Sequence, residues 1–330
     1  GCEININTMI IVTGANGFIG SAMVWQLNEA GHRDILCVDS IDLKTRPQLL
    51  SNKEYQSFLS KDELLVALES NQLKNIDWII HIGACSSTTE MNIEFLKENN
   101  TQYTQKLFNW CLKNHVPYVY ASSGAVYGGG ELGFDDQSSP DIFKPLNPYG
   151  NSKWEFDCWA LRQKQTPKNW YGLRFFNVYG PNESFKGEMA SVVYKAFHQV
   201  KKNKSLNLFK SYRPDYGDGQ QKRDFIYVKD ITRWILEIMK QRIPSGIYNM
   251  GAGTARTWLD LAGGVFSNLN VPLKINWIDM PENIQNQYQY FTEAKMQKLF
   301  NQGISKPQWS LEDGIKDYIR NYLSNDEAIL

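Results

Sequence analysis

Residues 9 to 20 read Met-Ile-Ile-Val-Thr-Gly-Ala-Asn-Gly-Phe-Ile-Gly, a short β-branched run that leads into three glycines. A helix-like segment, Ser21 to Glu29, follows directly. Gly14, Gly17 and Gly20 allow a tight turn, a close approach of the backbone to a pyrophosphate, and close packing of a helix on a strand. The helix N-terminus then offers unpaired N–H groups to the anion. Placed after a strand and before a helix, this spacing predicts a dinucleotide-binding turn.

The next strand-like run, Asp34-Ile-Leu-Cys-Val-Asp39, ends in a carboxylate about 20 residues after the glycines. Asp39 and the adjacent Ser40 would there lie near the ribose hydroxyls of an adenine dinucleotide, although Asp is also common as a cap or turn residue where a strand ends. Lys44 and Arg46 follow, and cations beside the ribose can pair with a 2′-phosphate. The sequence leaves NAD possible, and the two cations favour NADP.

A second group of residues predicts catalysis. Tyr149-Gly-Asn-Ser-Lys153 opens a helical stretch, so Tyr149 and Lys153 project from one face. We expect the Lys153 ammonium to favour the phenolate and lower the pKa of Tyr149 from its ordinary value of about 10. Ser123, at the end of a hydrophobic strand, can hydrogen-bond the substrate oxygen that Tyr149 deprotonates. The Tyr and Lys alone could be a surface pair, but the three residues in this order predict a hydride-transfer site.

Strand-like and helix-like stretches alternate along the chain. The predicted strands are Ile10–Val12, Ile35–Val38, Trp78–His81, Tyr118–Ala121 and Tyr171–Phe176, and the predicted helices include residues 99–114 and 152–163. This alternation predicts an α/β fold, a Rossmann-type doubly wound parallel sheet with ligands at the carboxyl ends of its strands.

Beyond residue 177 the pattern loosens, which predicts a smaller C-terminal substrate-binding lobe. We expect residues 9–177 to form the dinucleotide-binding domain, a later strand near 246–251 to return to it, and residues 178–330 to form mainly the second lobe, interleaved with the first. That lobe should hold a polar loop at 182–187, a helix at 189–201 and a long loop at 211–222 that acts as a lid. Residues 1–8 are interpreted as an extension or a cloning remnant.

Composition excludes several classes of function. The formal charge of the 330 residues is zero, so neither nucleic acid nor an anionic membrane surface is an expected partner. No apolar run approaches the roughly 18 to 20 residues of a membrane span, and we expect a cytoplasmic protein. Five scattered cysteines and four histidines show no metal-ligand spacing, which predicts neither a disulfide framework nor a metal site.

Several runs together resemble the extended short-chain dehydrogenase/reductase superfamily, whose members act on nucleotide-activated sugars, and within it the heptose 6-epimerase family. The two most discriminating runs are Gly83-Ala-Cys-Ser-Ser-Thr-Thr-Glu90 and Lys186-Gly-Glu-Met-Ala-Ser191. The others are Tyr120-Ala-Ser-Ser-Gly-Ala-Val-Tyr-Gly-Gly129, Lys144-Pro-Leu-Asn-Pro-Tyr-Gly-Asn-Ser-Lys153, Arg174-Phe-Phe-Asn-Val-Tyr-Gly-Pro181 and Lys222-Arg-Asp-Phe-Ile-Tyr-Val-Lys-Asp230. The resemblance covers essentially the whole chain after residue 8.

The resemblance implies an isomerase that converts ADP-D-glycero-D-manno-heptose to the L-glycero epimer at C6, for the inner core of lipopolysaccharide. The implied route is oxidation to a ketone and re-reduction with tightly bound NADP, in a homo-oligomer of five subunits. A UDP-hexose 4-epimerase or another nucleotide-sugar epimerase or reductase is the enzyme alternative, and a catalytically silent dinucleotide-binding protein is the alternative of another class. Ser123-Gly-Ala125 lacks the acidic pair of the sugar 4,6-dehydratases, which counts against them.

Epimerisation needs a proton acceptor for each orientation of the oxygen. The resemblance therefore implies Lys186 as a second catalytic group beside Tyr149, Ser123 and Lys153, although a loop lysine can also be solvated or bind phosphate. Arg223 suits a diphosphate because its guanidinium donates in pairs, but Asp224 could hold it instead.

The remaining implied contacts form two sets. The cofactor set is Gly14, Gly17, Phe18, Ile19, Gly20, Asp39, Ser40, Arg46, Lys61, Ile82, Gly83, Ala84, Cys85, Ser86, Asn99, Lys153 and Val178. The substrate set is Ser87, Ser123, Asn177, Glu188, Phe209, Arg223 and Tyr288.

Overall fold

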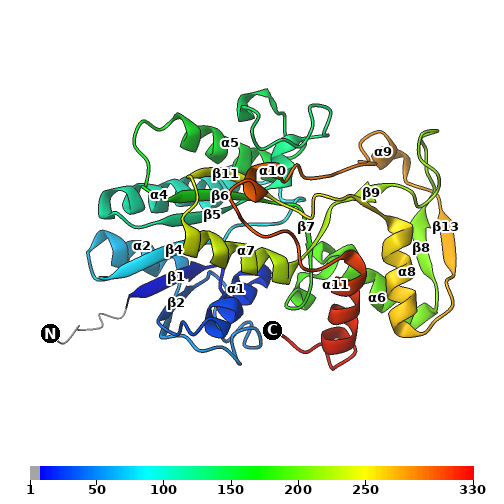
Figure 1. Cartoon of the computed structure of the whole chain (residues 1–330), viewed down its shortest axis with the longest axis horizontal. Helices are drawn as coiled ribbons and strands as arrows, with labels where there is room; N and C mark the ends of the chain where they lie inside the picture. The colour runs from blue at the N-terminus through cyan, green and yellow to red at the C-terminus, as the bar shows by residue number, and fades with distance from the viewer. Residues whose placement is uncertain (1–7) are drawn as a thin grey trace.

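The computed structural model describes residues 8–330, so the predicted extension, apart from Thr8, lies outside the described residues. Within this range the central sheet has seven parallel strands in the order β11-β6-β5-β4-β1-β2-β3 (Figure 1). The strands are β1 (Met9–Thr13), β2 (Ile35–Val38), β3 (Ser57–Leu59), β4 (Ile76–His81), β5 (Tyr118–Ser123), β6 (Trp170–Phe175) and β11 (Gly246–Met250). The predicted Rossmann-type sheet is confirmed.

The strand order reverses between β1 and β4. The chain runs outward from β1 to β3 and then returns to pair β4 with the other side of β1. Ligands of open α/β sheets bind in the crevice that such a reversal leaves at the carboxyl ends of the strands. The glycine turn after β1 lies at this point.

Alternate side chains of the strands enter two different cores. Ile10 and Val12 of β1 pack with α1 (Phe18–Glu29) and α7 (Val228–Gln241), whereas Ile11 packs with α4 (Tyr103–Asn114) and α5 (Pro148–Arg162) on the opposite face. This alternation follows from the two-residue period of a strand. Helices therefore cover both faces of the sheet, as Figure 1 shows.

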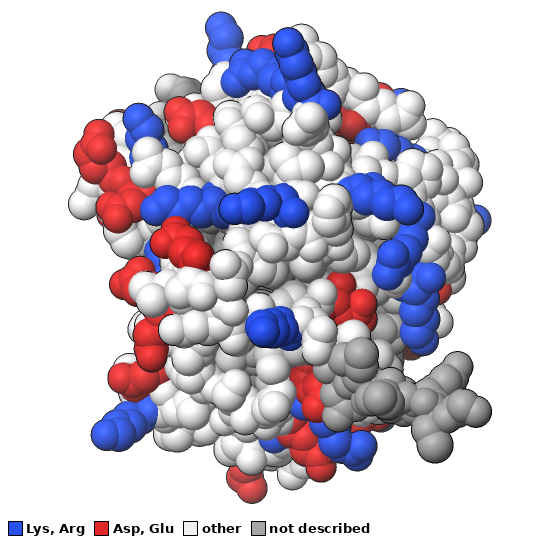
Figure 2. Space-filling model, turned by 90° about the vertical axis from the view of Figure 1, so that its left-hand side faces the viewer, with Lys and Arg blue, Asp and Glu red and all other residues white. Residues whose placement is uncertain are grey.

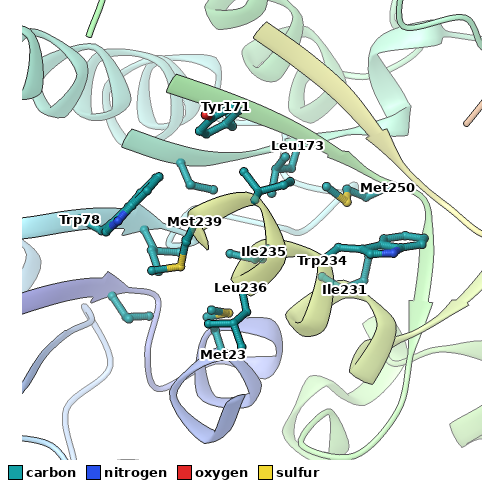
Figure 3. Packing of buried hydrophobic residues seen from close by; sticks show 14 of the residues in the cluster. Met23, Trp78, Tyr171, Leu173, Ile231, Trp234, Ile235, Leu236, Met239 and Met250 are labelled. Carbon is teal, nitrogen blue, oxygen red and sulfur yellow. The ribbon is translucent and has the colours of Figure 1, made fainter. Parts of the chain in front are cut away.

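Helix α7 lies after residue 177 in the chain but packs on the sheet. Its buried residues Ile231, Trp234, Ile235, Ile238 and Met239 follow the spacing of one helix face. Figure 3 shows this face against the side chains of the sheet strands and of α1. Together with β11, which pairs with β6, this helix brings the later part of the chain back to the sheet.

A separate hydrophobic core lies beyond the sheet, at the right of Figure 1. It is built from α6 (Val192–Asn203), β8 (Leu206–Phe209), α8 (Trp258–Leu269), β13 (Ile275–Ile278) and α11 (Leu311–Tyr318), with β8 and β13 paired in parallel. The shorter elements are α2 (Lys61–Glu69), α3 (Ile93–Leu96), η1 (Lys97–Gln102), η2 (Gly124–Tyr127), η3 (Pro140–Ile142), β7 (Asn177–Tyr179), η4 (Ser184–Met189), β9 (Lys222–Arg223), β10 (Phe225–Tyr227), β12 (Arg256–Thr257), α9 (Glu282–Gln285), α10 (Gln297–Phe300) and η5 (Ile319–Leu323). The domain boundary near residue 177 stays a prediction.

Two predicted helices differ from the observed ones. The helix predicted at 99–114 is divided into the π-helix η1 and α4. The helix predicted at 189–201 begins only at Val192, because the Ser191 side chain accepts from the N–H of Tyr194 and caps α6 there. The residues before it, predicted as a polar loop, include the 3₁₀-helix η4.

The described surface carries charges of both signs. Figure 2 shows Lys and Arg together with Asp and Glu on one face of the molecule, in keeping with a formal net charge of zero. None of the helices within residues 8–330 has both the length and the apolar character needed to cross a bilayer.

Candidate active site

A cleft of about 1140 Å³ runs along the carboxyl ends of the sheet strands. Its walls bring together every residue of the implied cofactor set, from the glycine turn to Val178, although these residues come from seven separate segments of the chain. The four implied catalytic residues, Ser123, Tyr149, Lys153 and Lys186, line the same cleft, as does Asn177 of the substrate set.

The glycine turn has no room for side chains. Gly14 adopts a φ of +67°, and a Cβ added to it would lie 2.6 Å from the amide nitrogen of Gly83 at the end of β4. A Cβ on Gly20 would lie 1.9 Å from the carbonyl oxygen of Gly14. The turn is thus a backbone cradle at the N-terminus of α1, and its residues fit the pyrophosphate of a dinucleotide.

We predict that Gly20→Ala removes stable cofactor binding, because the new methyl group would push the turn away from the anion. Overpacking of this kind costs about 1–3 kcal/mol or more. The nucleotide released on denaturation of the purified variant is measured by absorbance. Gly263→Ala on α8 is the control, since a Cβ there would meet nothing within 4 Å. A Gly20→Ala protein with the wild-type nucleotide content would contradict the role of this turn.

Asp39 is tied to the glycine turn. One carboxylate oxygen accepts from the N–H of Asn16 at 2.9 Å, and the other accepts from the N–H of Ile41 at 3.0 Å. Burial raises the pKa of Asp39, while these backbone donors and Arg46 oppose the rise. Arg46 Nη1 donates to the carbonyl oxygen of Asn16 at 2.5 Å. Asp39 therefore holds the turn and also lines the cleft with Arg46, and its contact with the ribose stays a prediction.

Another part of the cleft wall is held by side-chain amides. The Asn100 amide donates to the carbonyl oxygen of Cys85 at 3.1 Å and accepts from its N–H at 2.9 Å. Asn99 Oδ1 accepts a hydrogen bond from Lys61 Nζ. Both Asn residues belong to η1, and π-helical turns are frequent at functional sites. Asn100 was not among the predicted residues, because its role depends on a helical bulge that a regular periodicity does not indicate.

Tyr149 lies in the first turn of α5, which begins at Pro148 and is capped by Asn147. Burial raises the pKa of Tyr149, and a hydrogen bond with Ser123 partly offsets the rise. The expectation of a lowered pKa is therefore wrong for this arrangement, because burial outweighs the other contributions. Lys153 Nζ instead donates to the carbonyl oxygen of Ala121 at 2.8 Å. Burial lowers the pKa of Lys153 to about 8.

Lys186 lines the cleft from η4. Its Nζ lies 5.5 Å from the centre of the Phe18 ring, just after the glycine turn. Burial lowers the pKa of Lys186, and the carboxylate of Glu183 opposes this shift. A half-buried lysine with a lowered pKa is a better proton-transfer group than a fully solvated one.

Residues 10–251 match the family described as the NAD dependent epimerase/dehydratase family. The chain belongs to this family. A relative from Fusobacterium nucleatum subsp. nucleatum, named ADP-L-glycero-D-manno-heptose-6-epimerase, is 47% identical over 98% of this chain and 100% of its own. A relative of the same name from Nitratidesulfovibrio vulgaris (strain DP4) is 43% identical over 98% and 100%.

A solved structure has the same fold. The crystal structure of the Helicobacter pylori ADP-L-glycero-D-manno-heptose-6-epimerase is similar to this chain with a TM-score of 0.79. The two sequences are 27% identical, and the match covers 96% of each chain. The resemblance deduced from the sequence runs is confirmed, and the chain is an epimerase, an isomerase type of enzyme.

Three predicted substrate residues of this family member lie together outside the walls of the main cleft. The Arg223 guanidinium carbon lies 5.3 Å from the centre of the Tyr288 ring, and the Tyr288 and Phe209 rings meet edge to face at 6.2 Å. Asp224 does not pair with Arg223: its carboxylate accepts from the N–H groups of Ala252, Gly253 and Ala294. Arg223 is thus left beside aromatic rings.

The other substrate predictions fall in different places. Ser87 and Glu188 do not line the cleft, and Glu188 is exposed at the end of η4. The side-chain amide of Asn177 donates to the carbonyl oxygen of Asp224 at 3.2 Å. Within the loop predicted as a lid, the Arg213 guanidinium donates two hydrogen bonds to the Asp215 carboxylate, of 3.0 and 2.5 Å.

Several cleft residues had no signal in the sequence. Phe185, Gln289 and Thr292 line the cleft although they belong to no motif and lie far along the chain from the glycine turn. In residues 8–330 no group of three His, Cys, Asp or Glu side chains could hold a metal ion. The four cysteines in this range, Cys37, Cys85, Cys111 and Cys158, are free thiols.

Proposed function

We propose that this enzyme epimerises ADP-D-glycero-D-manno-heptose at C6, with Tyr149 and Lys186 as the two proton-transfer groups. The observation that carries this proposal is the cleft itself, which holds the Ser123, Tyr149 and Lys153 group and Lys186 together with the glycine turn. The names of the relatives supply the sugar nucleotide and favour it over a UDP-hexose.

The proposed steps follow from where the protons must go. Tyr149, as phenolate, takes the proton of the C6 hydroxyl, and Ser123 hydrogen-bonds the same oxygen. A nicotinamide dinucleotide, which the glycine turn and the other residues of the implied cofactor set would hold, would supply the acceptor and donor of the C6 hydride. After the ketone has turned its other face to the ring, its oxygen points away from Tyr149, and Lys186 donates the proton that completes the new hydroxyl. Lys153 donates to the carbonyl oxygen of Ala121 and so holds the end of the strand that carries Ser123.

The nucleotide part of the substrate is assigned to the Arg223 cluster. Its guanidinium offers paired donors to a diphosphate, and the rings of Tyr288 and Phe209 offer faces for a base. Burial lowers the pKa of Arg223, with Tyr288 opposing the shift. Because Asp224 does not pair with Arg223, the phosphate oxygens of the substrate would be the anionic partner of its guanidinium.

The substrate is tested by incubation with ADP-D-glycero-D-manno-heptose and, separately, with UDP-galactose. We expect the C6 signals of the heptose to change to those of a mixture of both epimers in the NMR spectrum, and UDP-galactose to stay unchanged. Conversion of UDP-galactose with an unchanged heptose would establish the alternative, a UDP-hexose 4-epimerase.

We predict that the enzyme is purified with NADP bound, because an enzyme that regenerates its own oxidant gains nothing by releasing it. Arg46 motivates the phosphorylated form, since it lines the cleft next to the Asp39 turn. The nucleotide released on denaturation is identified by mass spectrometry. Release of NAD alone would show that Asp39 determines the choice.

We also propose that the enzyme works in the cytoplasm as a homo-oligomer of five subunits. This assembly is tested by the mass of the particle in sedimentation or light scattering. A monomer that is fully active at assay concentration would contradict it.

A further inference from the structure

Residues 184–189, the flap, form the short helical segment η4, which is kinked at Gly187 and is held at both ends by Glu183. Before the flap, the Glu183 carboxylate accepts from the N–H of Gly180 at 3.0 Å and from the Tyr318 hydroxyl at 2.9 Å. After the flap, the Ser191 hydroxyl donates to the same carboxylate at 2.8 Å. Gly187 has a φ of +57°, with nothing within 4 Å of an added Cβ. The ends of the flap are thus anchored, while its middle is exposed.

One side chain of the flap contacts another segment of the cleft wall. The Arg46 guanidinium carbon lies 3.7 Å from the centre of the Phe185 ring, so the two groups stack although 139 residues separate them in the chain. Phe185 remains 39% exposed. The stack with Arg46 explains why the flap carries this large, partly exposed apolar ring. It joins the flap to the part of the cleft wall that carries Asp39.

The stack leaves the edge of Arg46 available. A ring on the flat face of a guanidinium does not block its N–H groups, which point outward in the plane. One of them, on Nη1, donates to the carbonyl oxygen of Asn16 in the glycine turn. Within the described residues no carboxylate forms an ion pair with Arg46, whose guanidinium can therefore accept an anion at its edge while Phe185 covers its face.

Lys186 follows Phe185 directly in the helical turn before the kink at Gly187. Its backbone N–H donates at 3.0 Å to the carbonyl oxygen of Glu183, the residue that anchors the flap. A change in the position of Phe185 therefore moves Lys186 as well. The flap links the adenosine-ribose end of the cleft to the second proton-transfer group.

We propose that Phe185 is a positioning residue that couples recognition of the 2′-phosphate of NADP to the placement of Lys186. A phosphate bound at the edge of Arg46 holds the guanidinium in the orientation on which Phe185 stacks, and this orders the flap with Lys186 over the cleft. The 2′-hydroxyl of NAD is neutral and does not hold the Arg46 guanidinium in this orientation. The inference rests on the proposed function, because it takes Lys186 as catalytic and NADP as the cofactor.

The coupling is measured by hydrogen–deuterium exchange of residues 182–190 in the holoenzyme, loaded with NADP or with NAD. In the wild type we expect slower exchange with NADP than with NAD. Phe185→Ala should remove the difference in exchange. It should also raise the dissociation constant for NADP by roughly 2- to 5-fold while leaving that for NAD unchanged. Finally, it should lower kcat more than it changes KM. Phe185→Tyr should restore all three, and the neighbouring Ser184→Ala should resemble the wild type.

A double-mutant cycle separates the stack from a general loss of stability. If the stack carries the coupling, Phe185→Ala should have no further effect on NADP affinity in an Arg46→Ala background. Equal exchange of the wild-type flap with both cofactors, or a cofactor difference that survives in Phe185→Ala, would overturn the inference. An unchanged C6 configuration of the heptose, or release of NAD alone, would instead remove the proposed function and this inference with it.

Discussion

Tyr149→Phe is expected to lower kcat by roughly 10²- to 10⁴-fold, with KM for the sugar nucleotide close to the wild-type value. The substitution removes only the phenolic oxygen from a residue that is 9% exposed, so the cleft keeps its shape. That oxygen matters chiefly in the transition state, where the proton leaves the C6 hydroxyl. Steady-state kinetics and the nucleotide content of the variant check the expectation together.

Tyr248→Phe is the matched control. Its hydroxyl is also in the interior and donates to the carbonyl oxygen of Pro244 at 2.6 Å, away from the cleft. We expect this variant to lose stability but to keep its turnover at temperatures where it remains folded. A Tyr149→Phe enzyme with a raised KM and an intact kcat would mean that Tyr149 only positions the sugar.

Lys186→Met is the substitution with the second large expected effect on turnover. Because the two epimers present their oxygens in different directions, loss of Lys186 should lower epimerisation by roughly 10²- to 10⁴-fold. The half-reaction at Tyr149 should persist, and it can be followed as slow dismutation of a 6-aldehyde analogue, which requires no inversion. The methionine keeps the length of the side chain and removes its proton.

The control for this variant is Lys202→Met, which changes an exposed lysine near the end of α6. It should epimerise at the wild-type rate. If Lys186→Met does so too, one residue must serve both faces of the ketone, and the two-base scheme does not apply to this enzyme.

The glycine turn shows why the fold could be predicted from the sequence. Its spacing places Gly14 and Gly20 where backbone contacts leave no room for a Cβ and Gly17 where a Cβ would be tight, and a short range of residues carries this whole requirement. The same holds for Tyr149 and Lys153, which share one helix. β11 at the edge of the sheet agrees with the strand expected near 246–251, and all five of its residues are buried.

Other features depend on contacts between distant segments and could not be predicted in this way. The pKa of Tyr149 was expected to fall because a cation lies four residues away, but burial by the rest of the protein raises it. The stack of Phe185 on Arg46 joins two loops that no local pattern connects. Asn100 acts through a π-helical turn, whose extra residue per turn interrupts the periodicity on which helix prediction relies.

The most direct test of the account is the fate of the hydrogen on C6. The enzyme is incubated with ADP-D-glycero-D-manno-heptose that carries deuterium at C6, in ordinary water, and the product is analysed by NMR and mass spectrometry. Transfer to and from the same bound cofactor predicts that the L-glycero product retains the deuterium at C6. Replacement of that deuterium by solvent hydrogen would contradict oxidation and re-reduction at C6, and with it the roles of Tyr149 and Lys186.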